Sequence, residues 1–304
     1  MRRIILVIAI FSISLLFGAG EPNKYLWLGI GAKSLSLGNT GVALDNLDCA
    51  PFYNPASVSE RGKFSLTAGN QFLALDRRIY YASLASEVSD GAGVGLVWIH
   101  SSVGDVDARD MDSEITGTVS NGNDAIYFAF AKRVFSNIHL GLGVEYLQSS
   151  LENLTAGTAG FGAGISYRIK DPQITVGLAA QNLFMKISWN SNDYYGLGYV
   201  SDEKIYELFR GGISYRGKIS AIPFVLTGDI WQFSADKINY GAGIEVEPLQ
   251  QLALRVGFTD NRPSAGIGIH TKIGKFSLVG LDYAFVIEKE NLTPRHIIDL
   301  TVEY

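Results

Sequence analysis

Apolar and polar residues alternate along most of the chain with a period of two. Residues 296–304 place Ile298, Leu300, Val302 and Tyr304 on one face and mostly polar residues on the other. Alternation over about eight to eleven residues is typical of a β-strand long enough to cross a bilayer. The other well-alternating segments are 138–146, 161–169, 174–180, 238–246, 252–258 and 281–287.

A second set of segments alternates less regularly. These segments are 63–75, 78–87, 91–100, 124–133, 205–216, 221–232, 264–273 and 275–287. With the C-terminal strand, the two sets predict about 14 strands. An even number of strands returns both ends of the barrel to the same side of the membrane.

The predicted connections alternate between short and long. Short links fall at 87–90, 134–137, 170–172, 216–218, 247–249 and Gly274. Long or polar links fall at 101–122, 148–158, 185–204, 232–237, 259–264 and 288–295. Outer-membrane barrels have short periplasmic turns and longer extracellular loops. We therefore predict an all-β fold, a transmembrane antiparallel up-and-down β-barrel formed by residues 62–304.

Both ends of the sequence favour the outer membrane. Arg2 and Arg3 precede an apolar stretch, 4–17, and the small residues 18–20 follow it. This order predicts a secretory signal peptide over residues 1–20. At the other end, Tyr304 resembles the terminal aromatic residue that marks outer-membrane barrels for assembly. We expect outer-membrane lipid and the barrel assembly machinery to be partners.

Residues of the opposite parity on each predicted strand face the lumen and are small or polar. The charged and amide candidates for the lumen are Glu145, Arg168, Gln181, Glu245, Arg255 and Asp282. Glycines occupy other inward positions at 141, 143, 160, 162, 164, 241, 243, 266 and 268. Glycine there either eases strand coiling or leaves room for a filler. The candidate filler is an N-terminal plug over residues 21–61, which lack strand alternation.

Composition and charge narrow the function classes. The chain holds 34 Gly, 16 Phe and 15 Tyr, which suits a barrel with aromatic girdles and a close-packed lumen. Its mean hydropathy is positive although no later segment is typical of a transmembrane helix. The net charge of −5 argues against nucleic acid as a partner. Cys49 has no second cysteine to pair with, so we expect a small buried side chain.

The predicted plug carries a family resemblance. Residues 31–43 (GAKSLSLGNTGVA) and 48–57 (DCAPFYNPAS) resemble the entry sequence of PorV/PorQ-type outer-membrane barrels. They are also similar to the N-terminal hatch of FadL long-chain fatty-acid transporters, which share the tripeptide Asn54-Pro55-Ala56. A second patch, 177–183 (GLAAQNL), resembles the PorV side.

The motif residues also suit a compact plug on physical grounds. Gly38 and Gly41 permit tight backbone turns, and Pro55 biases the preceding residue away from helix. Asn54 can satisfy exposed backbone groups in a turn. The simpler interpretation of Asn54, Pro55 and Ala56 is that they shape the plug without touching a ligand.

The resemblance implies two functions. PorV-type members serve the type IX secretion system, with secretion-system proteins as partners, and the sequence patches favour this function. FadL-type barrels instead take up hydrophobic small molecules such as long-chain fatty acids past the hatch, and this is the alternative. The resemblance implies no cofactor in either case.

An acidic stretch within the predicted loop 101–122 suggests a further site. Asp105, Asp107, Asp110, Asp112 and Glu114 offer the hard oxygen ligands that divalent cations prefer. They lack the spacing of a helix–loop–helix calcium loop, and a solvated extracellular loop is the favoured interpretation.

Aromatic residues mark the predicted loop 185–204. Trp189, Tyr194, Tyr195 and Tyr199 form either a hydrophobic capture surface or part of a girdle at the membrane interface. The sequence favours neither.

Enzyme motifs are absent from the sequence. The four histidines, His100, His139, His270 and His296, lie on different predicted strands without metal-ligand spacing. No Gly-x-Ser-x-Gly elbow or phosphate-binding loop occurs. We therefore expect no catalytic activity and no metal site.

Overall fold

The computed structural model describes residues 23–304 except 46, 61–63, 105, 120, 193–197, 235, 275 and 290–291. The predicted signal peptide, residues 1–20, therefore lies outside the described residues. Asp105, Tyr194 and Tyr195 lie outside them as well.

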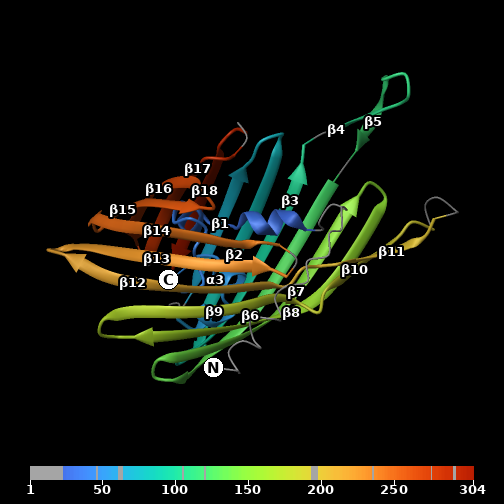
Figure 1. Cartoon of the computed structure of the whole chain (residues 1–304). Helices are drawn as coiled ribbons and strands as arrows, with labels where there is room; N and C mark the ends of the chain where they lie inside the picture. The colour runs from blue at the N-terminus through green and yellow to red at the C-terminus, as the bar shows by residue number, and fades with distance from the viewer. Residues whose placement is uncertain are drawn as a thin grey trace, which may run out of the picture.

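Within the described residues, 14 antiparallel strands close into one barrel (Figure 1). Neighbouring strands follow one another along the chain, and the first pairs with the last, so the predicted up-and-down transmembrane barrel is confirmed. The strands are β1 Ser65–Phe72, β2 Arg77–Ser89, β3 Ala92–Val103, β6 Asn121–Phe135, β7 Ile138–Leu151, β8 Leu154–Ile169, β9 Gln173–Leu183, β12 Leu208–Ile219, β13 Ile222–Phe233, β14 Ile238–Leu249, β15 Leu252–Thr259, β16 Arg262–Ile273, β17 Phe276–Val286 and β18 Arg295–Glu303.

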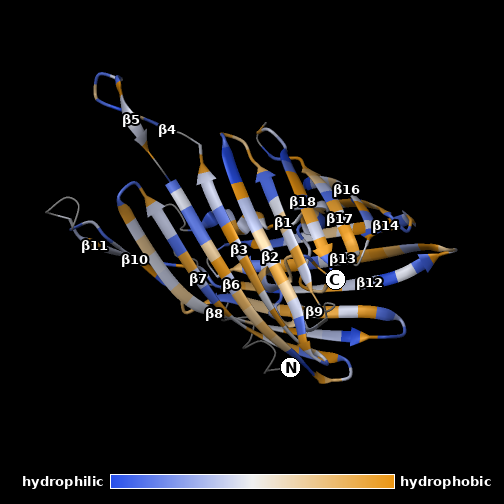
Figure 2. Cartoon of the chain, turned by 180° about the vertical axis from the view of Figure 1, so that it is seen from behind, coloured by the Kyte–Doolittle hydropathy of each residue, from blue (hydrophilic) through white to orange (hydrophobic). Residues whose placement is uncertain are grey.

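The alternation along the strands separates an outer apolar face from an inner face. In β7, Leu142 and Val144 point outward and are exposed, whereas Gly143 and Glu145 point inward and are buried. Apolar and polar bands accordingly alternate along the strands in Figure 2. Exposed leucine and valine are stable on the outer face because the bilayer, not water, surrounds it.

Two of the predicted long links are wrong. β7 and β8 are joined at 152–153, and β15 and β16 at 260–261, so 148–158 and 259–264 are mostly strand. The part of a strand that extends beyond the bilayer has no lipid-facing side. Its residues therefore need not alternate between apolar and polar, and their sequence resembles that of a loop.

Two other predicted loops contain hairpins that extend beyond the rim of the barrel (Figure 1). Loop 101–122 holds β4 (Val106–Arg109) and β5 (Ile115–Val119), and loop 185–204 holds β10 (Lys186–Asn190) and β11 (Val200–Lys204). In the second hairpin, a hydrogen bond from Lys186 lowers the pKa of Asp202.

The N-terminal segment, defined here as residues 23–45 and 47–60, lies against the inner face of the barrel. It contains η2 (Lys24–Leu28), α2 (Ala32–Ser36), α3 (Ala50–Tyr53) and η3 (Pro55–Glu60). α2 packs against β15 to β18, and η3 packs against β3, β6, β7 and β8. Most residues of the segment are buried, so it fills space that the barrel encloses.

Inward glycines bring the wall into backbone contact with this segment. A Cβ on Gly141 would overlap the backbone of Ala56, and one on Gly177 would overlap the carbonyl oxygen of Val42. A Cβ on Gly241 would likewise overlap the carbonyl oxygen of Gly38. These contacts favour the interpretation that the glycines leave room for the segment.

A buried ionic contact fixes the middle of the segment. Asp229 on β13 accepts the N–H groups of Gly41 at 2.8 Å and Val42 at 3.1 Å. Arg210 on β12 lies 3.5 Å from the same carboxylate and donates to the Asn39 carbonyl oxygen at 2.7 Å. The Arg210 guanidinium also lies over the rings of Trp231 and Tyr53, 4.5 Å and 5.0 Å from their centroids.

Strand β15 provides a test of which face meets lipid. Leu254 and Val256 are 44% and 56% exposed on the outer face, whereas Arg255 is 3% exposed. We expect Leu254→Arg and Val256→Arg each to reduce the folding free energy in phospholipid vesicles by about 2 to 4 kcal/mol, because a charge would enter hydrocarbon. Leu254→Met is the control. If both arginine variants fold as stably as Leu254→Met, the assigned outer face is wrong.

A second prediction concerns the Asp229 carboxylate. Asp229→Ala leaves the buried Arg210 without this partner, and losing one partner of a buried pair costs about 3 to 5 kcal/mol. We expect lower stability in denaturant titrations and faster hydrogen exchange at the Gly41 and Val42 amides. Asp202→Ala, on the exposed hairpin, should change neither. Unchanged exchange in Asp229→Ala would show that this carboxylate does not hold the segment.

Candidate functional site

The orientation of the barrel places η2 near its extracellular end. Short turns lie on the periplasmic side of such barrels, and with an even number of strands both ends of the barrel segment lie on that side as well. Gln71, near the extracellular end of β1, donates to the Gly29 carbonyl oxygen at 2.7 Å. Arg295, at the extracellular start of β18, donates to the Leu28 carbonyl oxygen at 3.1 Å. The N-terminal segment therefore begins high in the lumen.

Apolar side chains line this extracellular half of the lumen. Leu26 and Ile30 of the N-terminal segment belong to one buried apolar cluster with inward residues of the barrel wall. The wall residues of this cluster that are less than 2% exposed include Ile79, Val97, Ile99, Leu147 and Ile297, and Ile187 of β10 joins them. We call this region the apolar chamber; the side chains of the N-terminal segment fill it.

Aromatic rings form a second buried cluster around Trp27 of η2. Trp27 stacks on Phe233 with ring centroids 4.0 Å apart, and Tyr206 lies 6.4 Å from Trp27. Trp189 on β10 packs against the buried apolar cluster, whereas Tyr199 is exposed. Trp189 thus contributes to the chamber, whichever role the rest of its hairpin has.

The pairing of β8 with β9 breaks beside the apolar chamber. Ala163 faces Ala180, but Phe161 faces Leu183, so β9 carries an extra residue at the break. Glu145 on β7 is buried and accepts the Asn182 N–H at 2.6 Å. This hydrogen bond holds the extra residue of the break against the wall.

Neighbouring contacts connect the strand break to the chamber and the N-terminal segment. Gln181 donates to the Phe52 carbonyl oxygen at 2.8 Å. Met185 follows the break, belongs to the buried apolar cluster and lies against Gly160. The chamber therefore extends to a place where the pairing of the wall is irregular.

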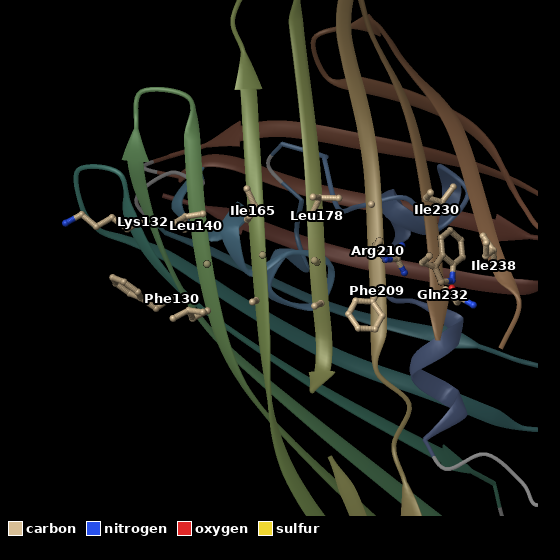
Figure 3. Close-up of a pocket in the computed structure, with 18 residues that line it drawn as sticks. Phe130, Lys132, Leu140, Ile165, Leu178, Phe209, Arg210, Ile230, Gln232 and Ile238 are labelled. Carbon is tan, nitrogen blue, oxygen red and sulfur yellow. The ribbon is translucent and has the colours of Figure 1, made fainter. Parts of the chain in front are cut away.

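A groove of about 860 Å³ lies on the outer face of the wall at the same strands (Figure 3). It runs across the strands from β6 to β14 and follows two lines of cross-strand neighbours. One line leads from Phe130 to Ile238, and the other from Lys132 to Ile230. The outward residues in its middle are small: Ala163, Ala180 and Gly211. We call it the outer groove; its apolar side chains face the hydrocarbon of the bilayer.

The Asn-Pro-Ala motif braces the wall behind the outer groove. Asn54 donates to the carbonyl oxygens of Val42 at 2.8 Å and Ile165 at 3.2 Å, and its own side-chain oxygen accepts the Ala56 N–H at 3.0 Å. Pro55 lies beside Gly143 and Gly164 on β7 and β8.

The other motif glycines are held close to the wall or to the segment itself. Gly38 has a left-handed φ of 78° and lies against the carbonyl oxygens of Ala242 and Phe258, where no Cβ fits. Gly41 lies against Tyr53 and donates its N–H to Asp229.

The remaining lumen candidates form a charged network below the chamber. Arg255 contacts Glu245 at 2.5 Å and also binds Asp282, which contacts His270 at 2.9 Å. Lys33 of α2 lies 3.4 Å from Glu245. Arg168, near the periplasmic end of β8, lies 2.7 Å from Asp45. Buried charges thus lie below the chamber, and also at Arg210 and Arg295, toward the extracellular ends of β12 and β18.

Sequence reasoning did not single out Arg210, Asn182 or Lys33 as site residues. Arg210 has inward parity on a predicted strand, and this signal could have identified it. Asn182 and Lys33 gave no such signal, because their roles arise from a strand break and from the fold of the N-terminal segment.

Tyr304 is exposed and donates its N–H to the Phe64 carbonyl oxygen at 3.0 Å, and its assembly role stays a prediction.

Other chemistry is not evident in the part of the chain that the structure describes. Among these residues, no group of three or more His, Cys, Asp or Glu side chains is arranged to hold a metal ion. Asp107 pairs with Arg109, and Asp110 accepts the N–H groups of Asp112 and Glu114. No described helix is long and apolar enough to cross a membrane.

Comparisons by sequence give no match: no family model and no curated protein matches this chain. Solved structures do match it. The toluene transporter TbuX from Ralstonia pickettii has a TM-score of 0.64 and 14% identity, over 91% of this chain and 98% of that chain. The toluene transporter TodX from P. putida has a TM-score of 0.60 and 11% identity, over 91% and 99% of the two chains.

A FadL homologue from Pseudomonas aeruginosa is similar with a TM-score of 0.55 and 11% identity, over 89% of this chain and 97% of that chain. None of these three structures is named as an enzyme or a secretion-system protein. The predicted resemblance to PorV/PorQ-type barrels thus gains no support here. At such low identity the likeness concerns the fold alone, and that fold is the FadL-type barrel.

Proposed function

We propose that this protein is an outer-membrane channel through which small hydrophobic molecules enter. The observation that carries the proposal is the apolar chamber, which reaches the β8–β9 break in front of the outer groove. At this break the wall has apolar side chains both on its lumen side and on its bilayer side. Such surfaces favour a ligand that is poorly soluble in water. The compared toluene transporters share the fold and support the same ligand class.

The route follows from the distribution of charge. A hydrophobic molecule would enter the chamber by displacing the apolar side chains of η2. Passage straight down would bring it against the buried charges of Arg255, Glu245 and Asp282. Disrupting such a network is costly, because it leaves buried charges without partners. Release through the β8–β9 break into the outer groove avoids this network and passes only Glu145, whose carboxylate is already hydrogen-bonded to Asn182.

The secretion function predicted from the sequence remains the competing hypothesis. It requires secretion-system proteins or secreted cargo to bind the barrel. No feature of the described residues favours such a partner over a hydrophobic ligand. Outer-membrane lipid and the barrel assembly machinery are expected partners under either function.

Uptake of radiolabelled toluene by cells that make the protein tests the proposal. We expect Ala163→Trp, which fills the outer groove beside the β8–β9 break, to lower uptake to the level of cells without the protein. Leu254→Trp adds a similar side chain to the outer face of β15, outside the outer groove, and should leave uptake unchanged.

Two outcomes would overturn this proposal. The first is wild-type uptake no faster than that of cells lacking the protein, with surface labelling confirming that the barrel is assembled. The second is equal loss in the two tryptophan variants, which would show that the outer groove has no special role. Co-purification of a secreted protein with an inactive wild type would favour secretion.

A further inference from the structure

A second cavity, of about 390 Å³, lies at the periplasmic end of the lumen. Its walls are the ends of β8, β9 and β12 with parts of β13 and β14, and the N-terminal segment closes its upper side at Leu44 and Asp45. We call it the periplasmic pocket. It is separate from the outer groove, and the transport route above does not use it.

Positive charge dominates this pocket. Four basic residues line it, Lys33, Arg168, Lys170 and Arg216, against two acidic residues. The acidic residues are Asp45, which pairs with Arg168, and Glu245, which pairs with Lys33 and Arg255. Both carboxylates are therefore engaged, and two of the four lining cations are not matched by a carboxylate of the lining.

The excess charge belongs to Lys170 and Arg216. Both are exposed at the mouth of the pocket, and no salt bridge of either residue is found among the described residues. The register places Arg216 beside Gln173 on β9 and Val225 on β13. A ligand in the pocket would thus meet a guanidinium, an ammonium and an amide together.

The remaining lining restricts the class of anion. Leu44 and Val225 are buried apolar residues, and the hydroxyl groups of Thr175 and Ser214 already donate to Asp45 and to the Ala43 carbonyl oxygen. An inorganic anion would leave the apolar surfaces uncovered, whereas a neutral hydrocarbon would leave the cations without a counter-charge. An arginine guanidinium matches a carboxylate in a bidentate geometry.

We propose that the periplasmic pocket binds a small organic carboxylate, with the carboxylate between Lys170 and Arg216 and a short apolar body against Leu44 and Val225. The cavity is large enough for one aromatic ring or a short alkyl chain. This site stands independently of the transport proposal, since it rests on different residues and concerns a water-soluble ligand.

Binding of 4-fluorobenzoate to the purified full-length protein in detergent, followed by fluorine NMR, tests this proposal. We expect Arg216→Gln and Lys170→Gln each to weaken binding about tenfold, because each removes a charged hydrogen bond to the carboxylate. Lys218→Gln removes one positive charge from the same end of β12 without touching the pocket lining, and it should bind like the wild type.

Neutral and inorganic probes separate the alternatives. We expect 4-fluorobenzyl alcohol to bind far more weakly than the acid. Equal binding of the alcohol, or equal weakening by Lys218→Gln, would overturn the proposal. Competition by inorganic phosphate as strong as that by benzoate would show a general anion site and overturn the carboxylate assignment. Toluene uptake should be normal in Arg216→Gln, so failure here leaves the transport test unaffected.

Discussion

The wall of this barrel and the N-terminal segment approach one another at backbone distance, and the other features of the lumen depend on that approach. The segment passes so close to the wall that no Cβ would fit at Gly141, Gly177 or Gly241. A close-packed interface of this kind gains dispersion contacts that a looser filling would lose. It also brings the backbone N–H groups of Gly41 and Val42 within reach of Asp229.

The close approach also determines which side chains of the N-terminal segment meet the wall at each level of the lumen. High in the barrel, Leu26 of η2 and the following Ile30 meet a wall of similar residues, so the chamber is apolar. Lower down, α2 brings Lys33 to the carboxylate of Glu245, and buried charges there need partners. A molecule that moves from the chamber toward the periplasm would therefore meet this network of buried charges.

The alternation along the chain was sufficient to predict the strands, because lipid outside and a packed lumen inside impose opposite requirements on successive residues. β7 illustrates this: 138–146 alternates strictly and lies within the bilayer-crossing part of the strand. Beyond Gln148 the same strand carries serines and was predicted as loop. The sequence does not predict the hairpins β4–β5 and β10–β11 for the same reason, because strands that pair outside the membrane need no apolar face.

The candidate site was less predictable, because it depends on which residues on different strands meet. Parity places Glu145 inside the barrel, but only the register shows that it meets Asn182 at an irregular pair of strands. The outer groove has the same origin. Inward glycines of β7, β8 and β9 bring the backbone of the wall against the N-terminal segment, and the small outward residues Ala163 and Ala180 line the groove on the opposite side. Close packing inside and a hollow outside thus meet at the same part of the wall.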